Sequence, residues 1–466
     1  MTHCTQLTFD FHLLKGRRVT GRFDAPAISS DGGGLLLREI DKKLGLIEMF
    51  AACFDDHRSP RFTTHSLKAL LSQRIFGIAL GYEDLNDHEQ LRHDPLMAVL
   101  AGKPPEEDAG FDLAGKSTLN RLELTQVRAS HKSRYKKIVA RHGDIEDFFV
   151  KVFLRVHHRP PKRIVLDIDA TDDPLHGHQS GRFFHGYYKS YCYLPLYIFA
   201  GSHLLCAKLR PSNIDAAAGT VKQLDRIVKQ IRAQWPKVKI VIRGDSGFCR
   251  DRIMNWCESN QVDYILGLAK NHRLSNILKR SLQQAEQQFY ATGKPARCFK
   301  DFRYRTVDSW SRTRRVVGKA EFLPKGANPR FVVTSLSSKE FAAESLYEQE
   351  YCARGEMENR IKEQQLYLFA DRTSASTMRA NQLRLWLSSV AYVLVNALRE
   401  FGLKGTELEK SQCHTIRLKL FKIGATIRVT VRRVWISLSA GYPFRATFDR
   451  VLENLKAMRS LNPSPG

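Results

Sequence analysis

Apolar residues recur at helical spacing through the first third of the chain. In segment 66–80 they return every three or four positions, which predicts a helix with one buried face. The same spacing predicts further helices over 35–50, 82–100, 117–124, 128–141 and 147–157. The rest of the first 60 residues is expected to be irregular. The pair Pro160–Pro161 cannot continue a helix, so it marks a boundary.

The pattern changes after this proline pair to short apolar runs bounded by turn residues. Strands are expected over 164–169, 193–200, 203–210, 238–243 and 263–269. Gly201–Ser202 is a two-residue hairpin turn between the second and third strands. Helices are expected over 215–235 and 251–260. Strands joined first by a hairpin and then by helices predict a mixed α/β sheet of the ribonuclease-H-like kind.

The second half of the chain predicts an insertion, a charged helix and a buried helix. Residues 297–336 alternate basic, aromatic and β-branched residues, which indicates β-structure. The apolar run 385–398 is too short to span a bilayer and is expected to be a buried helix. We therefore expect three regions: a helical DNA-binding region over 1–160, a ribonuclease-H-like catalytic core over 161–403 with a β-rich insertion at about 285–340, and a small basic region over 404–466.

Charge narrows the possible partners. The 466 residues carry a formal net charge of +26, and the basic residues are spread along the whole chain. Such an excess predicts a polyanionic partner, and without a membrane-spanning run nucleic acid is favoured over a membrane. The nine cysteines form no CxxC pair and match no common zinc pattern, so we expect reduced thiols in a cytoplasmic protein.

Two of the predicted strands end in carboxylates. In strand 164–169, alternation places Asp167 and Asp169 on one face, and strand 238–243 is followed by Asp245 between two glycines. A buried Asp is costly unless it is paired or bound to a metal. If the strands are neighbours, Asp169 and Asp245 meet at one edge of the sheet. Each acid taken alone is more simply explained as a turn former or a helix cap.

The predicted helix 351–365 brings a third acid. Tyr351, Arg354, Glu358, Lys362 and Gln365 share one face of this helix. A carboxylate between cations is also compatible with a solvated helix that carries internal ion pairs. Together with the two aspartates, however, Glu358 completes a set of three carboxylates. Such a set can hold two Mg²⁺ or Mn²⁺ ions that clamp a phosphodiester.

Basic and aromatic residues outside this helix are candidate DNA contacts. Four of them lie near the expected rim of the acidic site: Arg243, Lys189, Lys270 and Arg273. Four more lie in the basic run 128–141, which is either a solvated helix face or a DNA-contacting helix: Lys132, Arg134, Lys136 and Lys137. Trp310, in the basic β segment, is a candidate for stacking on an unpaired base.

Several blocks in order resemble a known family. These are LDIDAT at 166–171 with HGHQSG after it, YLPLYIF at 193–199, IRGDSGF at 242–248, and a Tyr-x2-Arg-x3-Glu-x6-Lys helix that starts at Tyr351. They resemble the DDE transposases of bacterial insertion sequences, within the group 1 DDE transposases, and the likeness is to insertion-sequence family 1380. The departure is Gln365, which stands where the signature has Lys.

The resemblance implies roles for these residues. Asp169, Asp245 and Glu358 would be the catalytic, metal-binding triad, and Tyr351 and Arg354 would contact the backbone of the transposon end. The partners implied are double-stranded DNA, as transposon ends and target, and a second copy in a homodimeric paired-end complex at the bacterial nucleoid. The expected reaction is cleavage at the element ends and transfer of the 3′-OH into target DNA. A structure-selective nuclease and an inactive DNA-binding regulator remain alternatives.

Overall fold

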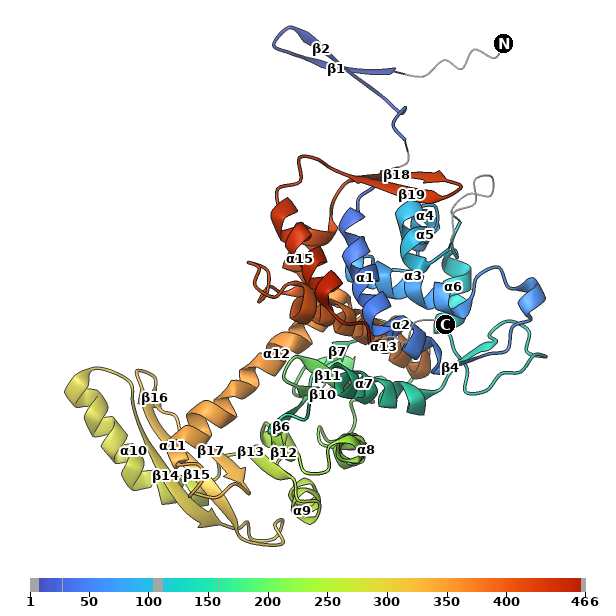
Figure 1. Cartoon of the computed structure of the whole chain (residues 1–466). Coiled ribbons are helices and arrows are strands. Elements are labelled where there is room, and N and C mark those ends of the chain that lie inside the picture. Colours follow the sequence, from blue (N-terminus) through green and yellow to red (C-terminus); the bar gives the residue numbers. More distant parts are fainter. Residues whose placement is uncertain (1–7, 27, 104–111, 158, 462–466) are drawn as a thin grey trace, which may run out of the picture.

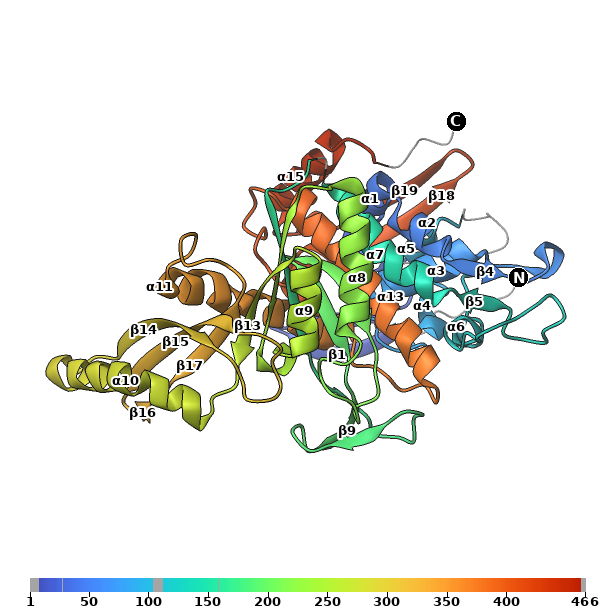
Figure 2. The same cartoon turned by 90° about the horizontal axis from the view of Figure 1, so that it is seen from below.

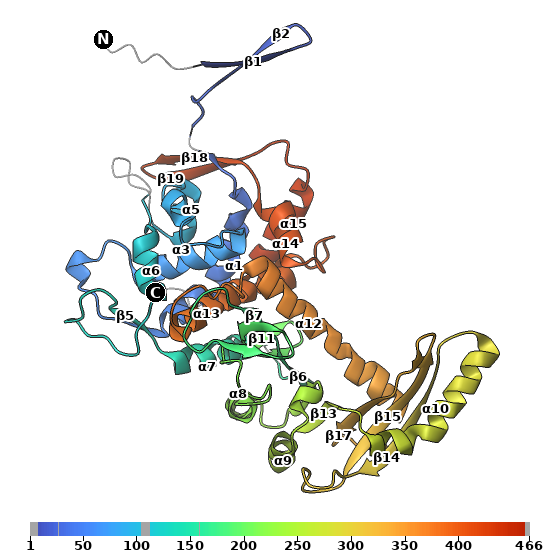
Figure 3. The same ribbon diagram turned by 180° about the vertical axis from the view of Figure 1, so that it is seen from behind.

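The structure is a computed structural model that describes residues 8–26, 28–103, 112–157 and 159–461. Figure 1 shows a helical body, built from the first and last parts of the chain, above a sheet from its middle. A β-rich part with its own helix extends the sheet to one side, and α12 (Gly355–Lys362) runs between it and the body (Figures 1 and 3). No helix in the described ranges is long and apolar enough to cross a membrane.

The sheet begins with the five strands that the sequence predicts. They are β6 (Arg163–Ala170), β10 (Leu196–Ala200), β11 (His203–Lys208), β12 (Lys239–Gly244) and β13 (Asp263–Leu268). Their spatial order is β11-β10-β6-β12-β13. β6, β12 and β13 are parallel, whereas β10 is antiparallel to both β6 and β11. The carboxyl ends of β6 and β12 therefore lie side by side in the middle of the sheet.

Three helices cover one face of this part of the sheet. α7 (His142–Val156) packs on β11 and on α8 (Thr220–Gln234), and α8 packs on α9 (Asp251–Ser259). Figure 2 shows α8 and α9 side by side in front of the strands. The buried side chains of α8 recur at the predicted spacing, because that face meets the apolar residues of β6, β10 and β12.

The predicted β-rich insertion continues the same sheet. β17 (Arg330–Thr334) pairs with β13, β15 (Arg314–Leu323) pairs with β17 and with the short β16 (Gly326–Ala327), and β14 (Ala296–Tyr304) forms the outer edge. α10 (His272–Thr292) packs on β14 and β15 (Figure 1). Trp310 is only 4% exposed here, between the Tyr304 ring and the Arg314 guanidinium, so the prediction that it stacks on a base is wrong.

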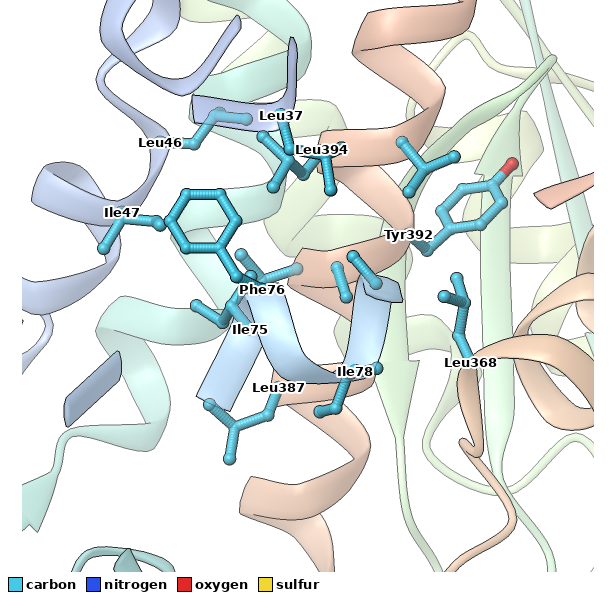
Figure 4. Close-up of a cluster of buried hydrophobic side chains, with 14 of the residues drawn as sticks. Leu37, Leu46, Ile47, Ile75, Phe76, Ile78, Leu368, Leu387, Tyr392 and Leu394 are labelled. Carbon is cyan, nitrogen blue, oxygen red and sulfur yellow. The ribbon is translucent and has the colours of Figure 1, made fainter. Parts of the chain in front are cut away.

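The helical body has one core to which both ends of the chain contribute. α1 (Leu35–Leu44), α2 (Leu46–Ala51) and α3 (Leu67–Leu80) pack around the central helix α13 (Met378–Ala397). α6 (Lys116–Glu123) packs on both α3 and α13, and α5 (Pro95–Ala101) packs on α3. α15 (Arg445–Ala457) packs on α1. Figure 4 shows Leu37, Ile47 and Phe76 from the first segments against Leu387 and Leu394 of α13. The predicted buried helix 385–398 is thus the axis of this body.

A small sheet also joins the two ends. β3 (Ile28–Ser29) pairs with β18 (Ala425–Thr430), which pairs with β19 (Arg433–Leu438). The remaining short strands are β4 (Phe54–Asp56) with β5 (Ile138–Ala140), and β7 (Asp173–Pro174), β8 (Phe183–His185) and β9 (Ser190–Tyr193) in a separate sheet beside β6. The three-region division of the chain stays a prediction; the packing adds that its first and third regions share a core.

Two predictions of local structure are wrong. Residues 8–22 are not irregular but form a hairpin, β1 (Thr8–Leu14) with β2 (Arg17–Arg22), which stands away from the body (Figures 1 and 3). Residues 128–137 form no helix. Ser130 and Ser133 hydrogen-bond each other's backbone in a tight turn, which competes with helix formation. The β-branched Ile138 and Val139 that follow pair with β4 instead.

Candidate active site

Asp169 and Asp245 stand next to each other at the ends of parallel neighbours. Gly244 of β12 is in register with Ile168 of β6, so the next residue on each strand is one of the two acids. A Cβ at position 244 would lie 2.8 Å from Ile168 Cγ1, so only glycine lets the strands pack this closely here. Asp245 caps the following short helix, since its Oδ1 accepts from Gly247 N at 2.8 Å.

The third acid reaches the same place on α12. Arg354 contacts both elements: its Nη1 lies 3.3 Å from Asp169 Oδ2, and its Nη2 lies 2.8 Å from Glu358 Oε1. Asp169 and Glu358 are 189 residues apart in sequence, yet both contact one guanidinium. The structure therefore brings the strand ends and the charged helix together.

The acids repel one another electrostatically. The pKa of Asp169 is raised to about 6. Burial is the main cause, and the nearby carboxylates of Asp245 and Glu358 act in the same direction, whereas Arg354 lowers this pKa. The same carboxylates raise the pKa of Arg354 against the effect of its own burial. Three carboxylates thus share one cationic side chain, and negative charge is in excess.

The donor set suits a hard divalent cation. The groups that face each other are carboxylates, which are the ligands that Mg²⁺ and Mn²⁺ prefer, and the excess negative charge would be relieved by a cation. In the described part of the chain no group of three or more His, Cys, Asp or Glu side chains already has the spacing of a metal site. In this structure the Arg354 guanidinium lies between Asp169 and Glu358 and contacts both.

Tyr351 lies against β13 beside Asp245. A Cβ added to Gly267 of β13 would be 2.6 Å from the Tyr351 hydroxyl and 3.1 Å from the Asp245 carbonyl carbon. Burial raises the pKa of Tyr351, and Asp245 contributes in the same direction. Gly267 is a site residue that the sequence interpretation missed. The signal was present, because an isolated glycine inside an apolar strand often marks close approach of another group.

Arg243 is not at the rim, and its prediction as a phosphate contact is wrong. It is 7% exposed, and its Nε and Nη2 bind Asp167 at 2.5 and 2.8 Å. Its Nη1 donates to the backbone oxygen of Glu350, in the helical turn before α12. One buried guanidinium thus ties together β6, β12 and the segment that carries Glu358. Burial raises the pKa of Asp167, and its hydrogen-bond partner is Arg243.

Gln365, which replaces the signature Lys, faces inward. Its Nε2 donates to Asp172 O at 2.9 Å and to Asp173 Oδ1 at 3.0 Å. Asp173 is fully buried, and burial raises its pKa to about 8. Lys362, one turn earlier, is exposed. The amide at position 365 therefore supplies a neutral hydrogen bond to a buried carboxyl group.

The remaining predicted DNA contacts lie in two places. Lys189, with φ +55 at the tip of the β8–β9 hairpin, and Lys270 and Arg273 after β13 are exposed near the sheet. The other four lie in the loop between α6 and β5, within the helical body: Lys132, Arg134, Lys136 and Lys137. Among the described residues no hydrogen bond or ion pair joins this loop to Asp169, Asp245 or Glu358, so it is a separate basic surface.

Comparisons with known proteins identify a family and similar solved structures. The family model for transposase DDE domain group 1 matches residues 11–460. A search of curated proteins found no match. Among solved structures, a piggyBac transposase synaptic complex with hairpin DNA aligns with 94% of this chain and 87% of its own, at 11% identity and a TM-score of 0.40.

Proposed function

The chain belongs to the transposase DDE domain group 1 family, and we propose that it cuts the ends of an insertion sequence and joins the freed 3′-OH to target DNA. Family membership supports the class of reaction. The observation that supports the location of the site is the Arg354 guanidinium, which contacts Asp169 and Glu358 while Asp245 raises the pKa of Asp169. We propose further that it belongs to insertion-sequence family 1380, because its sequence motifs resemble those of that family.

Asp169, Asp245 and Glu358 are the proposed catalytic residues and cation ligands. DDE transposases generally use divalent metal ions, and two Mg²⁺ or Mn²⁺ ions would activate the attacking oxygen and stabilise charge on the phosphodiester. Asp169 and Asp245 are held rigidly by paired strands, whereas Glu358 is on a helix whose preceding turn is fixed by Arg243. Fixed supports of this kind would hold the three acids at one backbone phosphate of the bound DNA.

Other residues of the site would position the DNA. Arg354 can form a bidentate contact with a phosphate, and the Tyr351 hydroxyl lies beside Asp245, where it can donate to a backbone oxygen. Lys362, Lys189, Lys270 and Arg273 are exposed cations for the flanking phosphates, and the 132–137 loop would contact DNA farther from the acids. Gln365 brings no charge, so we assign it no phosphate contact.

The proposed architecture is a ribonuclease-H-like core, supported by the strand order β11-β10-β6-β12-β13 with one antiparallel strand beside a parallel set. Residues 1–160 are the proposed DNA-binding region, with residues 404–466 as a basic C-terminal addition to it. Two copies of the chain would pair two element ends at the bacterial nucleoid.

Incubating the full-length protein with labelled element-end duplex, target plasmid and Mg²⁺ tests the proposal. We expect cleavage at the element end and joined product, both lost in Glu358→Gln. Cleavage without joined product would favour a structure-selective nuclease. A Glu358→Gln variant that cut and joined like the wild type would remove the triad assignment, and DNA binding without either reaction in the wild type would favour a regulator.

A further inference from the structure

A second cationic site lies in the helical body, away from the acids. The loop 57–66, with a short helical turn at Pro60–Phe62, and the loop 124–137 project together from one side of the body (Figures 1 and 3). Between them is a cleft of about 380 Å³. Arg58, Arg121, Arg134 and Lys137 line it, and no carboxylate is among its lining residues.

The cations of this cleft are mostly unpaired. Arg58 is held by Asp56 from outside the cleft, whereas Arg121, Arg134 and Lys137 make no ion pair with a carboxylate of the described residues. The cleft of about 660 Å³ between α9 and β15 differs, because carboxylates line it and pair with most of its arginines: Arg314 binds Glu258 and Asp251, and Arg315 binds Asp301. Unpaired cations in a concave surface attract a polyanion.

Exposed aromatic rings flank these cations. Tyr135 is 57% exposed, and the guanidinium carbons of Arg121 and Arg134 lie 5.5 and 5.0 Å from its ring centroid. Phe62, from the other loop, is 82% exposed, with Arg61 at 5.7 Å from its ring. Phe62 and Tyr135 both line the cleft, so two exposed rings lie beside its cations. Aromatic rings and arginine planes beside phosphate-binding cations are the surface on which unpaired bases stack.

We propose that this cleft, between Phe62 and Tyr135, binds single-stranded DNA and accommodates an unpaired nucleotide. Its volume is in the range of about 300–1,000 Å³ found for small-ligand clefts, whereas a duplex needs a much larger interface. Arg121, Arg134 and Lys137 hold the backbone, and the base stacks on Phe62 and on the Tyr135–arginine stack. The choice of DNA as the nucleic acid rests on the proposed transposase function.

Fluorescence anisotropy with a labelled oligo-dT strand of about ten nucleotides and a labelled blunt duplex of unrelated sequence tests the site. Phe62→Ala and Tyr135→Ala should each weaken binding of the single strand about tenfold and leave duplex binding within about twofold. Tyr135→Phe, which keeps the ring, should bind like the wild type. Tyr290→Ala, which removes another exposed aromatic ring, on α10, is the matched control and should have no effect.

Three results would overturn the inference: unchanged single-strand affinity in both alanine variants, an equal loss for strand and duplex, or the same loss in Tyr290→Ala. Equal thermal melting of all variants shows that each is folded. Cleavage of element-end duplex is measured in parallel. Variants that lose single-strand binding but still cut would support both this inference and the proposed function. Variants that cut and bind like the wild type would overturn this inference alone and leave the proposed function intact.

Discussion

The buried carboxylates of the helical body and the partly exposed carboxylates at the ends of β6 and β12 have opposite charge surroundings. Glu123 of α6 is fully buried and is bound by Arg74 and Arg384, each at 2.7 Å. Glu363, 1% exposed, is likewise bound by two arginines, Arg399 at 2.7 Å and Arg360 at 2.8 Å.

At the end of β6 the ratio is reversed. Asp169 and Glu358 share the single guanidinium of Arg354, and Asp245 lies close enough to interact with it electrostatically. A carboxylate that only stabilises a fold needs full compensation, since burial of an unpaired charge is costly. A site that must take up a divalent cation benefits from uncompensated negative charge. Acids fully paired with arginines are therefore structural in this chain, and incompletely paired acids are functional. Substitutions of individual residues test this distinction.

Asp169→Asn should give the largest effect, on activity and not on stability. Removal of one cation ligand should lower element-end cleavage by more than about 10³-fold, equivalent to several kcal/mol of transition-state stabilisation. The melting temperature should stay equal or rise, because one of three mutually repelling charges is gone. A clear fall in melting temperature would place Asp169 with the structural acids.

Glu123→Gln should lower stability and leave activity unchanged. It leaves Arg74 and Arg384 buried with a neutral partner, which we expect to cost about 3–5 kcal/mol in the free energy of unfolding. Denaturant unfolding measures this cost. Activity per folded molecule should be unchanged at a temperature where the variant is folded. A loss smaller than about 1 kcal/mol would contradict the structural assignment.

Arg243→Lys tests an intermediate case, in which one carboxylate faces one arginine. Lysine keeps the charge but cannot bind both oxygens of Asp167 and also reach Glu350 O, so about 2 kcal/mol of stability should be lost. Because Glu350 precedes α12, cleavage by the folded variant should also fall. Equal stability with unchanged cleavage would show that this link does not position Glu358.

Asp173→Asn should give the smallest effect, seen only in its pH dependence. The folded-state pKa of Asp173 is about 8, far above its ordinary value, so the folded chain holds a proton that the unfolded chain releases. Wild-type stability should therefore fall as pH rises toward 8, by about 1–2 kcal/mol between pH 6.5 and 8, and the loss levels off above the folded pKa. Melting curves of Asp173→Asn at the two pH values should show a smaller difference, since asparagine stays neutral.

The sequence predicted what depends on local pattern and missed what depends on distant partners. The five strands and the Gly201–Ser202 turn follow from alternation and turn chemistry. The acids at the carboxyl ends of β6 and β12 follow from their position in the sequence. The sequence around Arg243 suggested an exposed cation at the rim of the acidic site. Its actual partners, Asp167 and Glu350 O, are distant in sequence and cannot be recognised from it.

Other errors have the same origin. The helix expected over 128–141 has helical composition, but its serines form a turn and its end pairs with β4. The arginine pair around Glu123 joins residues from α3, α6 and α13, which no sequence spacing connects. Solvation and pairing of charges are tertiary properties, so which acids are compensated becomes visible only in the fold.

The shared core of the helical body has a consequence for synthesis. α1 rests on α13 and α15, β3 pairs with β18, and Leu461 N donates to Lys43 O. The first helices emerge from the ribosome long before the segments that cover them. Their apolar faces therefore stay exposed until almost the entire polypeptide has been synthesised. A prematurely terminated product would then be aggregation-prone. It would not be a stable DNA-binding fragment, so it would have no function of its own.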